Sequence, residues 1–191
     1  MRYRRAKTKG GTFFFTVVTY EREVLFEDVK NLDLLKEAIK HVKLKHPFRM
    51  DAFVFLPDHL HCIWTLPEND NDFSTRWMLI KSYFSRNIEL SSHCCISLSR
   101  FKKRERCLWQ RRFWEHEIKD EGDLTSHIEY IHYNPVKHGH VFNPVDWVNS
   151  SFHHYVKKGI YESNWGSIDN ALRDHVGLRV AQPNLRALGK I

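Results

Sequence analysis

The stretch FRMDAFVFLPDHLHCIWTL, residues 48–66, decides the fold because it holds two apolar runs that meet at Pro57 and Asp58. Proline and aspartate between two such runs are typical of a tight turn. We therefore expect strands over 48–57 and 59–66 that pair as an antiparallel hairpin.

The second strand of this hairpin carries two histidines one residue apart. Side chains alternate between the faces of a strand, so His59 and His61 should share one face with Ile63. Leu60 and Cys62 should point to the other face. Two neighbouring imidazoles suit a metal ion, although ordinary strand histidines produce the same pattern.

The segments on either side of the hairpin predict one more strand and two helices. Residues 12–20 alternate as a strand, and residues 31–46 place apolar side chains at helical spacing. Pro47 ends that first helix. Ser74 or Thr75 could cap a second helix after the hairpin.

The second half of the chain adds a strand and a helix. Residues 107–118 alternate as a fourth strand or a bent pair, and a last helix follows with Asp123 as its cap and Gly139 as its stop. The order β-α-β-β-α-β-α predicts an α+β domain with helices packed on a central antiparallel sheet. Its β-α-β-β-α-β part is ferredoxin-like. We expect this domain over residues 1–165 and a C-terminal tail over 166–191.

Composition argues against several other classes of protein. A chain of 191 residues with 42% hydrophobic residues can bury a real core. It has no run of about eighteen apolar residues, so we expect no membrane span. No signal-type apolar segment follows the basic N-terminus, which favours a cytoplasmic protein. None of the four cysteines shows CxxC spacing, which argues against a zinc knuckle or a disulfide framework.

The positive charge is clustered along the chain and is interleaved with aromatic residues. Thirty Lys and Arg against 23 Asp and Glu leave a net charge of +7. Single-stranded nucleic acid needs cations for its phosphates and aromatic faces for its unstacked bases, although a solvated basic surface is the simpler alternative. The candidate DNA-binding residues are Arg2, Arg4, Arg5, Lys102, Lys103, Arg104, Trp109, Arg111, Arg112 and Trp114.

The last helix carries two stripes of residues. An apolar stripe for the core contains Leu124, Ile128 and Ile131. A polar stripe contains His127, Tyr130, Asn134 and Lys137. Pro135 disfavours helical geometry at the residue before it, so the helix should kink or end there. A tyrosine and an amide four residues apart could still face one site together.

Four segments carry a resemblance to a known family: FLPDHLHCIWTLPEND, WQRRFWEHEI, YIHYNPVKHG and DWVNSSFHHYVKKGIY. In this order they resemble a REP-associated tyrosine transposase, a relative of the single-tyrosine transposases of the HUH nuclease superfamily. The resemblance covers nearly the whole chain and implies the HUH nuclease fold. Residues of about 88–107 look longer and more basic than in the shortest members, and the tail after Asn164 matches weakly.

The resemblance also implies a chemistry. The family cuts single-stranded DNA with a tyrosine, here Tyr130, leaving a 5′-phosphotyrosine and a 3′-hydroxyl that can rejoin another end. Such a reaction needs a divalent ion, Mg²⁺ or Mn²⁺, for which His59, His61 and Asn134 would be the ligands. Lys137 could contact phosphate. The expected partner is a REP-type hairpin with a single-stranded stretch, at the nucleoid, and the protein could act as a monomer or a dimer.

Two alternative functions remain open on the sequence. A metal-dependent phosphoesterase would use bound water as nucleophile, and Tyr130 would only pack. A catalytically silent, sequence-specific DNA-binding protein would tolerate the loss of Tyr130. A covalent protein–DNA adduct would distinguish the transposase from both, with Tyr133 as the weaker candidate for the nucleophile.

Overall fold

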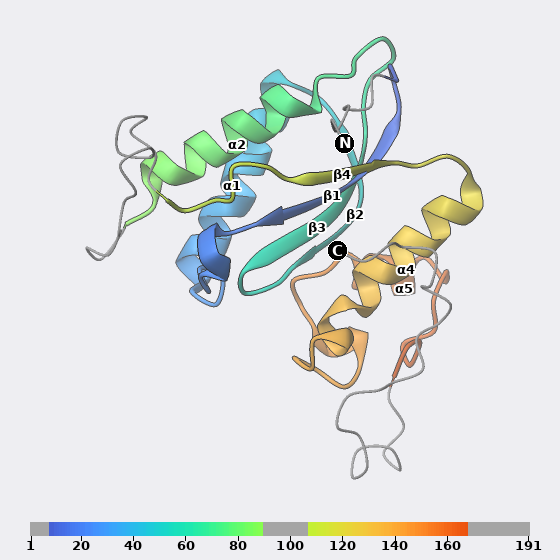
Figure 1. Ribbon diagram of the computed structural model, residues 1–191. Coiled ribbons are helices and arrows are strands. Elements are labelled where there is room, and N and C mark those ends of the chain that lie inside the picture. Colours follow the sequence, from blue (N-terminus) through green and yellow to red (C-terminus); the bar gives the residue numbers. More distant parts are fainter. Residues whose placement is uncertain (1–7, 90–106, 168–191) are drawn as a thin grey trace. The chain divides into compact units, whose positions relative to one another are not determined.

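The computed structural model describes residues 8–89 and 107–167, and these residues form two compact units (Figure 1). The first unit groups the chain up to Asp51 with Phe55–Ile118. The second unit groups Ala52–Val54 with the remaining C-terminal part. The second unit is therefore discontinuous in the sequence.

A four-stranded antiparallel sheet organises the N-terminal part of the chain. Its strands and helices are β1 (Thr12–Val18), α1 (Val29–Lys45), β2 (Arg49–Phe55), β3 (His59–Thr65), α2 (Phe73–Asn87) and β4 (Trp114–Glu117). The strand order across the sheet is β2-β3-β1-β4, which is the order of a ferredoxin-like core. The predicted α+β fold with an antiparallel sheet is therefore confirmed.

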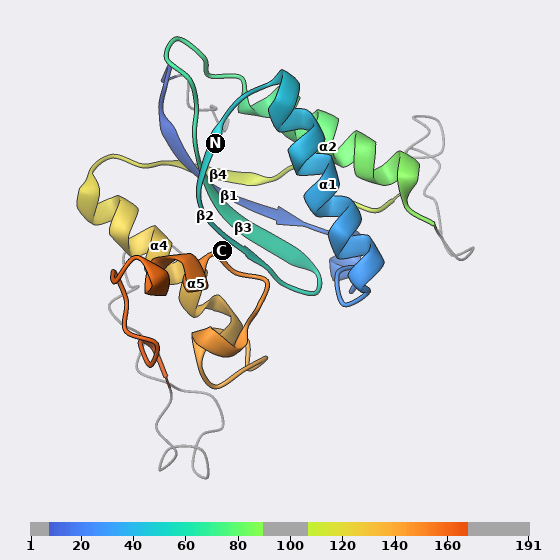
Figure 2. The same ribbon diagram turned by 180° about the vertical axis from the view of Figure 1, so that it is seen from behind.

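Aromatic side chains fill the space between this sheet and α2. Phe13 and Phe15 on β1 contact Phe73 on α2, with ring centroids 5.0 and 5.4 Å apart. Trp64 on β3 stacks on Trp77 of α2 at 4.3 Å. Helix α1 packs beside α2, as Figures 1 and 2 show from two sides. The alternate residues of β1 and β3 point to the other face of the sheet, and both histidines of β3 are among them.

A buried arginine connects three segments of the first unit. Arg76 in α2 is only 2% exposed. Its guanidinium donates to the backbone oxygen of Pro47 at 2.8 Å, to that of Asp72 at 2.8 Å and to the carboxylate of Asp70 at 2.6 Å. These acceptors belong to the segments before β2 and before α2. The cation is tolerated in the interior because its donors have partners.

Replacing Arg76 with methionine should lower the free energy of unfolding by about 3 kcal/mol, because several acceptors lose their charged donor at once. Urea unfolding followed by circular dichroism measures this change. Arg86→Met is the matched control, since Arg86 lies on the same helix but is exposed, and we expect a change below about 0.5 kcal/mol. Equal losses in the two variants would contradict the structural role of Arg76.

The second unit is built around one long helix. Its helical elements are α4 (Glu121–Lys137), the short 3₁₀ turn η2 (Pro144–Asp146) and α5 (Phe152–Lys157). The middle of β2 belongs to this unit because Val54 bridges Ser150. In addition, the backbone nitrogen of Ser151 donates to the backbone oxygen of Phe53 at 2.9 Å.

A histidine on α4 lies at the centre of an aromatic cluster in the second unit. The ring of His132 contacts the rings of Phe152, Tyr155 and Tyr161 at centroid distances of 5.7, 4.7 and 5.5 Å. Its Nε2 makes a hydrogen bond of 2.8 Å with the hydroxyl of Ser151. Burial lowers the pKa of His132 to about 3, so the ring is neutral near pH 7.

The starts of two helices differ from those predicted. Helix α2 is capped by Asp72, whose carboxylate accepts from the backbone nitrogen of Thr75, so the predicted caps Ser74 and Thr75 are wrong. Helix α4 is capped by Asp120, whose carboxylate accepts from the backbone nitrogen of Asp123, so that predicted cap is also wrong. Several polar residues in each first turn compete for the cap, and the earlier aspartate has the cap geometry.

Among the helices of the described ranges, none is long and apolar enough to cross a membrane.

The end of α4 confirms one prediction and corrects another. The helix continues through Pro135 and ends at Lys137, so of the two outcomes expected at this proline, a kink or an end, the end at Asn134 is wrong. Pro135 lies in the last turn, and only Val136 and Lys137 continue the helix beyond it. Gly139 follows with φ of 73°, a conformation that suits glycine, and its predicted role as helix stop is confirmed.

The fourth strand is shorter than predicted. Residues 107–118 were expected to form a fourth strand or a bent pair, and β4 covers only Trp114–Glu117. Before it, the chain makes an isolated bridge between Trp109 and Thr19. Cys107 has a positive φ of 49°, which breaks the extended geometry at the start of this segment.

Candidate active site

The two histidines of β3 lie side by side on one face of the sheet, as the alternation predicts. The ring centroids of His59 and His61 are 5.0 Å apart, and the rings are nearly perpendicular. Both side chains are buried, with exposed fractions of 4% and 2%. Phe14 of β1 stacks on the His61 ring at 5.4 Å. Such confined, adjacent imidazoles can act together on one ion.

A protein hydrogen bond holds Nδ1 of each ring. Nδ1 of His61 bonds to Oγ1 of Thr16 at 2.9 Å, and these two residues are directly opposite in the β1–β3 pairing. Nδ1 of His59 bonds to Oδ1 of Asp58 at 2.5 Å. The ring nitrogen that each histidine would offer a metal is therefore Nε2. Partners of this kind orient metal-binding imidazoles in many proteins.

Asp58 is held in turn by an arginine from a different part of the chain. Nη1 of Arg22 donates to Oδ2 of Asp58 at 2.8 Å. Burial alone would raise the pKa of Asp58, but the hydrogen bonds and charges of His59 and Arg22 outweigh burial and lower it. Asp58 is therefore an ionised carboxylate near pH 7. The sequence pattern indicates only a turn at Asp58 and does not indicate a role for Arg22.

The turn that carries Arg22 has an unusual backbone. This turn, η1 (Tyr20–Arg22), contains two consecutive non-glycine residues with positive φ, Glu21 at 52° and Arg22 at 56°. The left-handed region costs such residues roughly 1–2 kcal/mol each. The hydroxyl and the backbone nitrogen of Thr19, just before the turn, both donate to the backbone oxygen of Asp58, at 2.8 and 2.9 Å. The turn is thereby anchored to the residue that precedes His59.

The predicted nucleophile lies on α4 in the second unit. The Tyr130 side chain is largely buried, with 8% exposed. Nζ of Lys137 lies 4.7 Å from the centre of its ring, a cation–π contact between residues two helical turns apart. Tyr133, the alternative nucleophile, is also buried, and burial raises its pKa, which disfavours its phenolate.

Asn134 lies one turn after Tyr130 and is fully buried. Its Nδ2 donates to the backbone oxygen of Tyr130 at 3.4 Å. Its Oδ1 is buried and makes no hydrogen bond within the described residues. A buried amide oxygen without a donor is uncommon in folded proteins and is a suitable ligand for a hard cation. Oδ1 of Asn134 therefore has the chemistry of a ligand for a divalent metal ion.

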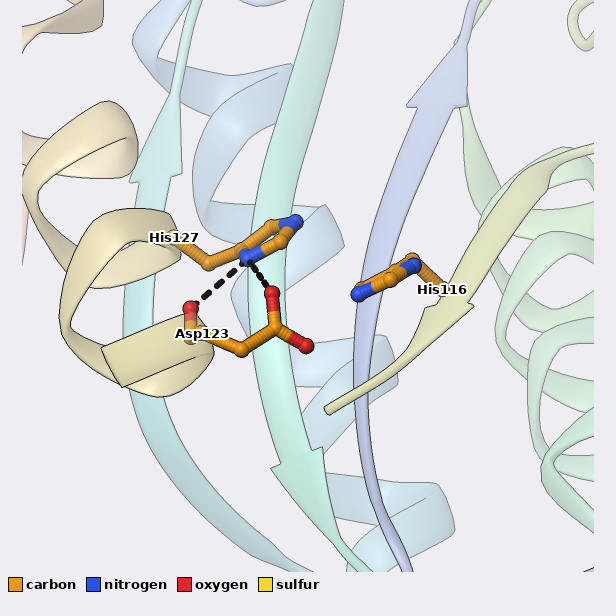
Figure 3. Close-up of side chains that lie close together, drawn as sticks. All are labelled: His116, Asp123 and His127. Atoms are coloured by element: carbon orange, nitrogen blue, oxygen red, sulfur yellow. Dashed lines mark hydrogen bonds and ion pairs between the residues drawn. The ribbon is translucent and has the colours of Figure 1, made fainter. Parts of the chain in front are cut away.

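A second histidine of α4 is paired with a carboxylate. Nδ1 of His127 bonds to the backbone oxygen of Asp123 at 2.8 Å and to its carboxylate at 3.0 Å (Figure 3). Both oxygens only accept, so Nδ1 carries the hydrogen. His127 is 1% exposed, whereas the predicted core residues Leu124 and Ile128 are only half-buried. The apolar stripe is thus correct for Ile131 and wrong for the other two residues.

The structure describes only part of the predicted DNA-binding set. Arg2, Arg4, Arg5, Lys102, Lys103 and Arg104 lie outside the described residues, as does most of the tail over 166–191. Arg111, Arg112 and Lys137 are exposed. Trp114 is 37% exposed and stacks on His116 in parallel, at 5.9 Å. Trp109 is buried between Phe26 and Phe84, which argues against its stacking on a base.

Lys81, which no sequence motif singles out, lies beside the segment that leads into β4. Its Nζ donates to the backbone oxygen of Gln110 at 2.9 Å. The same atom lies 5.5 Å from the ring centre of Trp109 and 5.7 Å from that of Phe113. Burial lowers the pKa of Lys81 to about 8. Lys81 therefore anchors the base of the segment that presents Arg111 and Arg112 to solvent.

The class of the protein follows from this fold, these residues and a family match. The family described as "Transposase IS200 like" matches residues 11–134, a range that includes both histidines of β3 and Tyr130. The class is therefore that of the IS200-like transposases, which are enzymes.

Individual relatives identify the branch of this class. The REP-associated tyrosine transposase of Escherichia coli K12 is 43% identical over 163 residues, 85% of this chain and 89% of the relative. A Haemophilus influenzae protein provisionally assigned to the same group is 44% identical over 165 residues, 86% of this chain and 92% of that protein. A solved REP-associated tyrosine transposase bound to a REP hairpin is 39% identical with a TM-score of 0.72, and the match covers 95% and 99% of the two chains. The chain belongs to the REP-associated tyrosine transposases.

Proposed function

We propose that this transposase cleaves and rejoins single-stranded DNA beside REP-type hairpins, with Tyr130 as the nucleophile. The observation that carries the proposal is the similarity, over nearly the full length of both chains, to a transposase solved with a REP hairpin. The residues that the chemistry needs are present here: a tyrosine on α4, a histidine pair on β3 and a buried amide on α4. A DNA substrate also implies that the protein works at the nucleoid.

The tyrosine reaction keeps the energy of the broken phosphodiester bond in a new bond between the tyrosine oxygen and the phosphorus. The phenol oxygen of Tyr130 loses its proton and attacks the phosphorus of a backbone phosphodiester. The bond from phosphorus to the 3′-oxygen breaks, and that oxygen takes up a proton to become a 3′-hydroxyl. The 5′-phosphate remains bonded to the tyrosine. Attack by a 3′-hydroxyl on the phosphotyrosine reverses the step and joins strands without an energy cofactor.

A divalent ion, Mg²⁺ or Mn²⁺, would be held by Nε2 of His59, Nε2 of His61 and Oδ1 of Asn134. When bound, such an ion supplies positive charge that stabilises the phosphodiester during attack. The protein supports the ligand set through the Nδ1 hydrogen bonds of both histidines and the buried position of the amide. Lys137, whose ammonium group lies over the Tyr130 ring, would add a phosphate contact at the nucleophile.

The DNA-binding surface would combine basic residues with one aromatic ring. Arg111, Arg112 and Trp114 precede or begin β4, are exposed, and would contact the phosphates and one base of a single strand. The basic residues proposed from the sequence outside the described ranges are Arg2, Arg4, Arg5, Lys102, Lys103 and Arg104. The transposase domain would span residues 1–165.

The direct test is to trap the covalent intermediate. The protein is incubated with a 5′-extended REP-type hairpin and Mn²⁺, with the label on the 3′ side of the cleavage site, which remains attached to the tyrosine. A denaturing gel should then show a labelled band at the mass of protein plus DNA, and EDTA should remove it. Cleaved DNA without any adduct would instead indicate a metal-dependent phosphoesterase. Binding without cleavage would indicate a catalytically silent DNA-binding protein.

We further expect a hairpin with a short 5′ single-stranded extension to bind about tenfold more tightly than the same sequence as a perfect duplex. The duplex offers as many phosphates, so charge alone would not favour the hairpin, and the preference must come from shape and unpaired bases. Competition binding at fixed salt measures the ratio, and a scrambled hairpin of equal length is the control. Equal competition by duplex and hairpin would show a generic basic DNA-binding protein.

A further inference from the structure

We propose that Arg22 is a positioning residue for His59 and acts through Asp58. The inference rests on the proposed function, in which His59 is a metal ligand. The three side chains form a continuous series: Arg22 Nη1 donates to one carboxylate oxygen of Asp58 at 2.8 Å, and His59 Nδ1 donates to the other at 2.5 Å. All three belong to the first unit.

The direction of these hydrogen bonds fixes the tautomer of His59. An ionised carboxylate only accepts hydrogen bonds, so Nδ1 of His59 must carry the hydrogen. In the neutral ring, the lone pair is then on Nε2, the nitrogen needed for a metal. Arg22 contributes by holding the carboxylate in the orientation that faces Nδ1. Without it, Asp58 can rotate and His59 can adopt the other tautomer.

The surrounding backbone is built to bring Arg22 to this position. Thr19 is fully buried and holds the backbone oxygen of Asp58 through two hydrogen bonds. Two and three residues later, Glu21 and Arg22 both adopt left-handed φ without being glycine. An ordinary surface ion pair does not require such a conformation, and strained backbone is concentrated at functional sites.

The same sheet contains a matched pair that serves as a control. Arg49 donates to Asp51 at 2.6 Å, and Asp51 accepts from the hydroxyl of Thr65 at 2.6 Å. The carboxylate side chains of Asp51 and Asp58 are equally exposed, at 17%, and both arginine side chains are mostly exposed. The two sets of hydrogen-bonded side chains differ in the residue that contacts the carboxylate on the side away from the arginine. This residue is Thr65 in one set and His59, the proposed metal ligand, in the other.

The first measurement is the tautomer of His59 in the metal-free protein, read from two-dimensional ¹⁵N–¹H spectra of the histidine rings. The unsubstituted protein should show Nδ1–H, whereas Arg22→Gln and Asp58→Asn should show a mixture. Arg49→Gln should leave the spectrum of His59 unchanged. His61, whose Nδ1 is held by Thr16, is an internal control in all variants.

The second measurement is Mn²⁺ affinity by titration calorimetry. Asp58→Asn should weaken binding about tenfold to a hundredfold, as loss of an orienting partner typically does. Arg22→Gln should weaken it severalfold, and Arg49→Gln should not change it. An unchanged His59 tautomer in Arg22→Gln, or equal effects of Arg22→Gln and Arg49→Gln, overturns the inference. If the unsubstituted protein binds no Mn²⁺ and forms no adduct, the proposed function fails, and the tautomer spectra still decide the role of Arg22.

Discussion

Tyr130→Phe should abolish the covalent adduct and lower DNA cleavage by on the order of 10⁴-fold or more, because only the nucleophilic oxygen is removed. DNA binding and the unfolding midpoint should stay close to those of the unsubstituted protein. The phenyl ring keeps its contact with Lys137 and its packing, since Tyr130 is largely buried in α4. The measurement is single-turnover cleavage of a labelled hairpin, combined with a denaturing gel for the adduct.

Tyr133→Phe is the matched control for this experiment. Tyr133 lies on the same helix, is equally buried and loses the same hydroxyl, so any effect of substitution on the helix is shared. We expect Tyr133→Phe to cleave at nearly the original rate. An adduct that persists in Tyr130→Phe and disappears in Tyr133→Phe would reverse the assignment of the nucleophile.

His59→Ala and His61→Ala should each weaken Mn²⁺ binding by about 100-fold, since removing one ligand costs several kcal/mol of interaction with the ion. Cleavage should fall with affinity and recover in part at high Mn²⁺ concentration. Asn134→Ala should weaken both properties less, because an amide oxygen is a weaker ligand than an imidazole. Titration calorimetry gives the affinities, and cleavage rates across Mn²⁺ concentrations give the activity.

The control for the histidine variants is His41→Ala. His41 lies on α1, where its ring contacts Tyr83, and the substitution removes an imidazole without touching the β3 pair. We expect unchanged Mn²⁺ affinity for this variant. If His59→Ala also bound Mn²⁺ with unchanged affinity, the proposed metal site would be excluded.

The fold was largely predictable because the strongest patterns lie in its centre. The alternation in β1 and β3 and the turn at Pro57 and Asp58 defined the sheet and the shared face of the two histidines. The helix starts were not predictable, because Asp72 and Asp120 compete with polar residues up to three positions later, and only the backbone geometry distinguishes them.

The sequence indicates the principal candidate residues of the site, but it does not indicate the residues that make hydrogen bonds to them. The spacing of His59 and His61 along one strand is visible in the sequence. Their partners come from elsewhere in the chain: Thr16 through the register of β1 with β3, and Arg22 through a turn with positive φ. Neither partner can be identified from the spacing of residues along the sequence. The burial of Asn134 and His127 is not visible in the sequence either, because a polar stripe on a helix can face solvent as well as a site.

The discontinuity of the second unit limits how this protein can be divided. Ala52–Val54 belong with the tyrosine-bearing helix, yet they lie inside the hairpin that leads to the histidines. No single cut in the chain yields two fragments that each keep all of their own contacts. A fragment ending at Ile118 would lose the bonds of Phe53 and Val54 to Ser151 and Ser150. The histidine-bearing strand and the tyrosine-bearing helix therefore cannot be separated by one cut after β4 without breaking these hydrogen bonds.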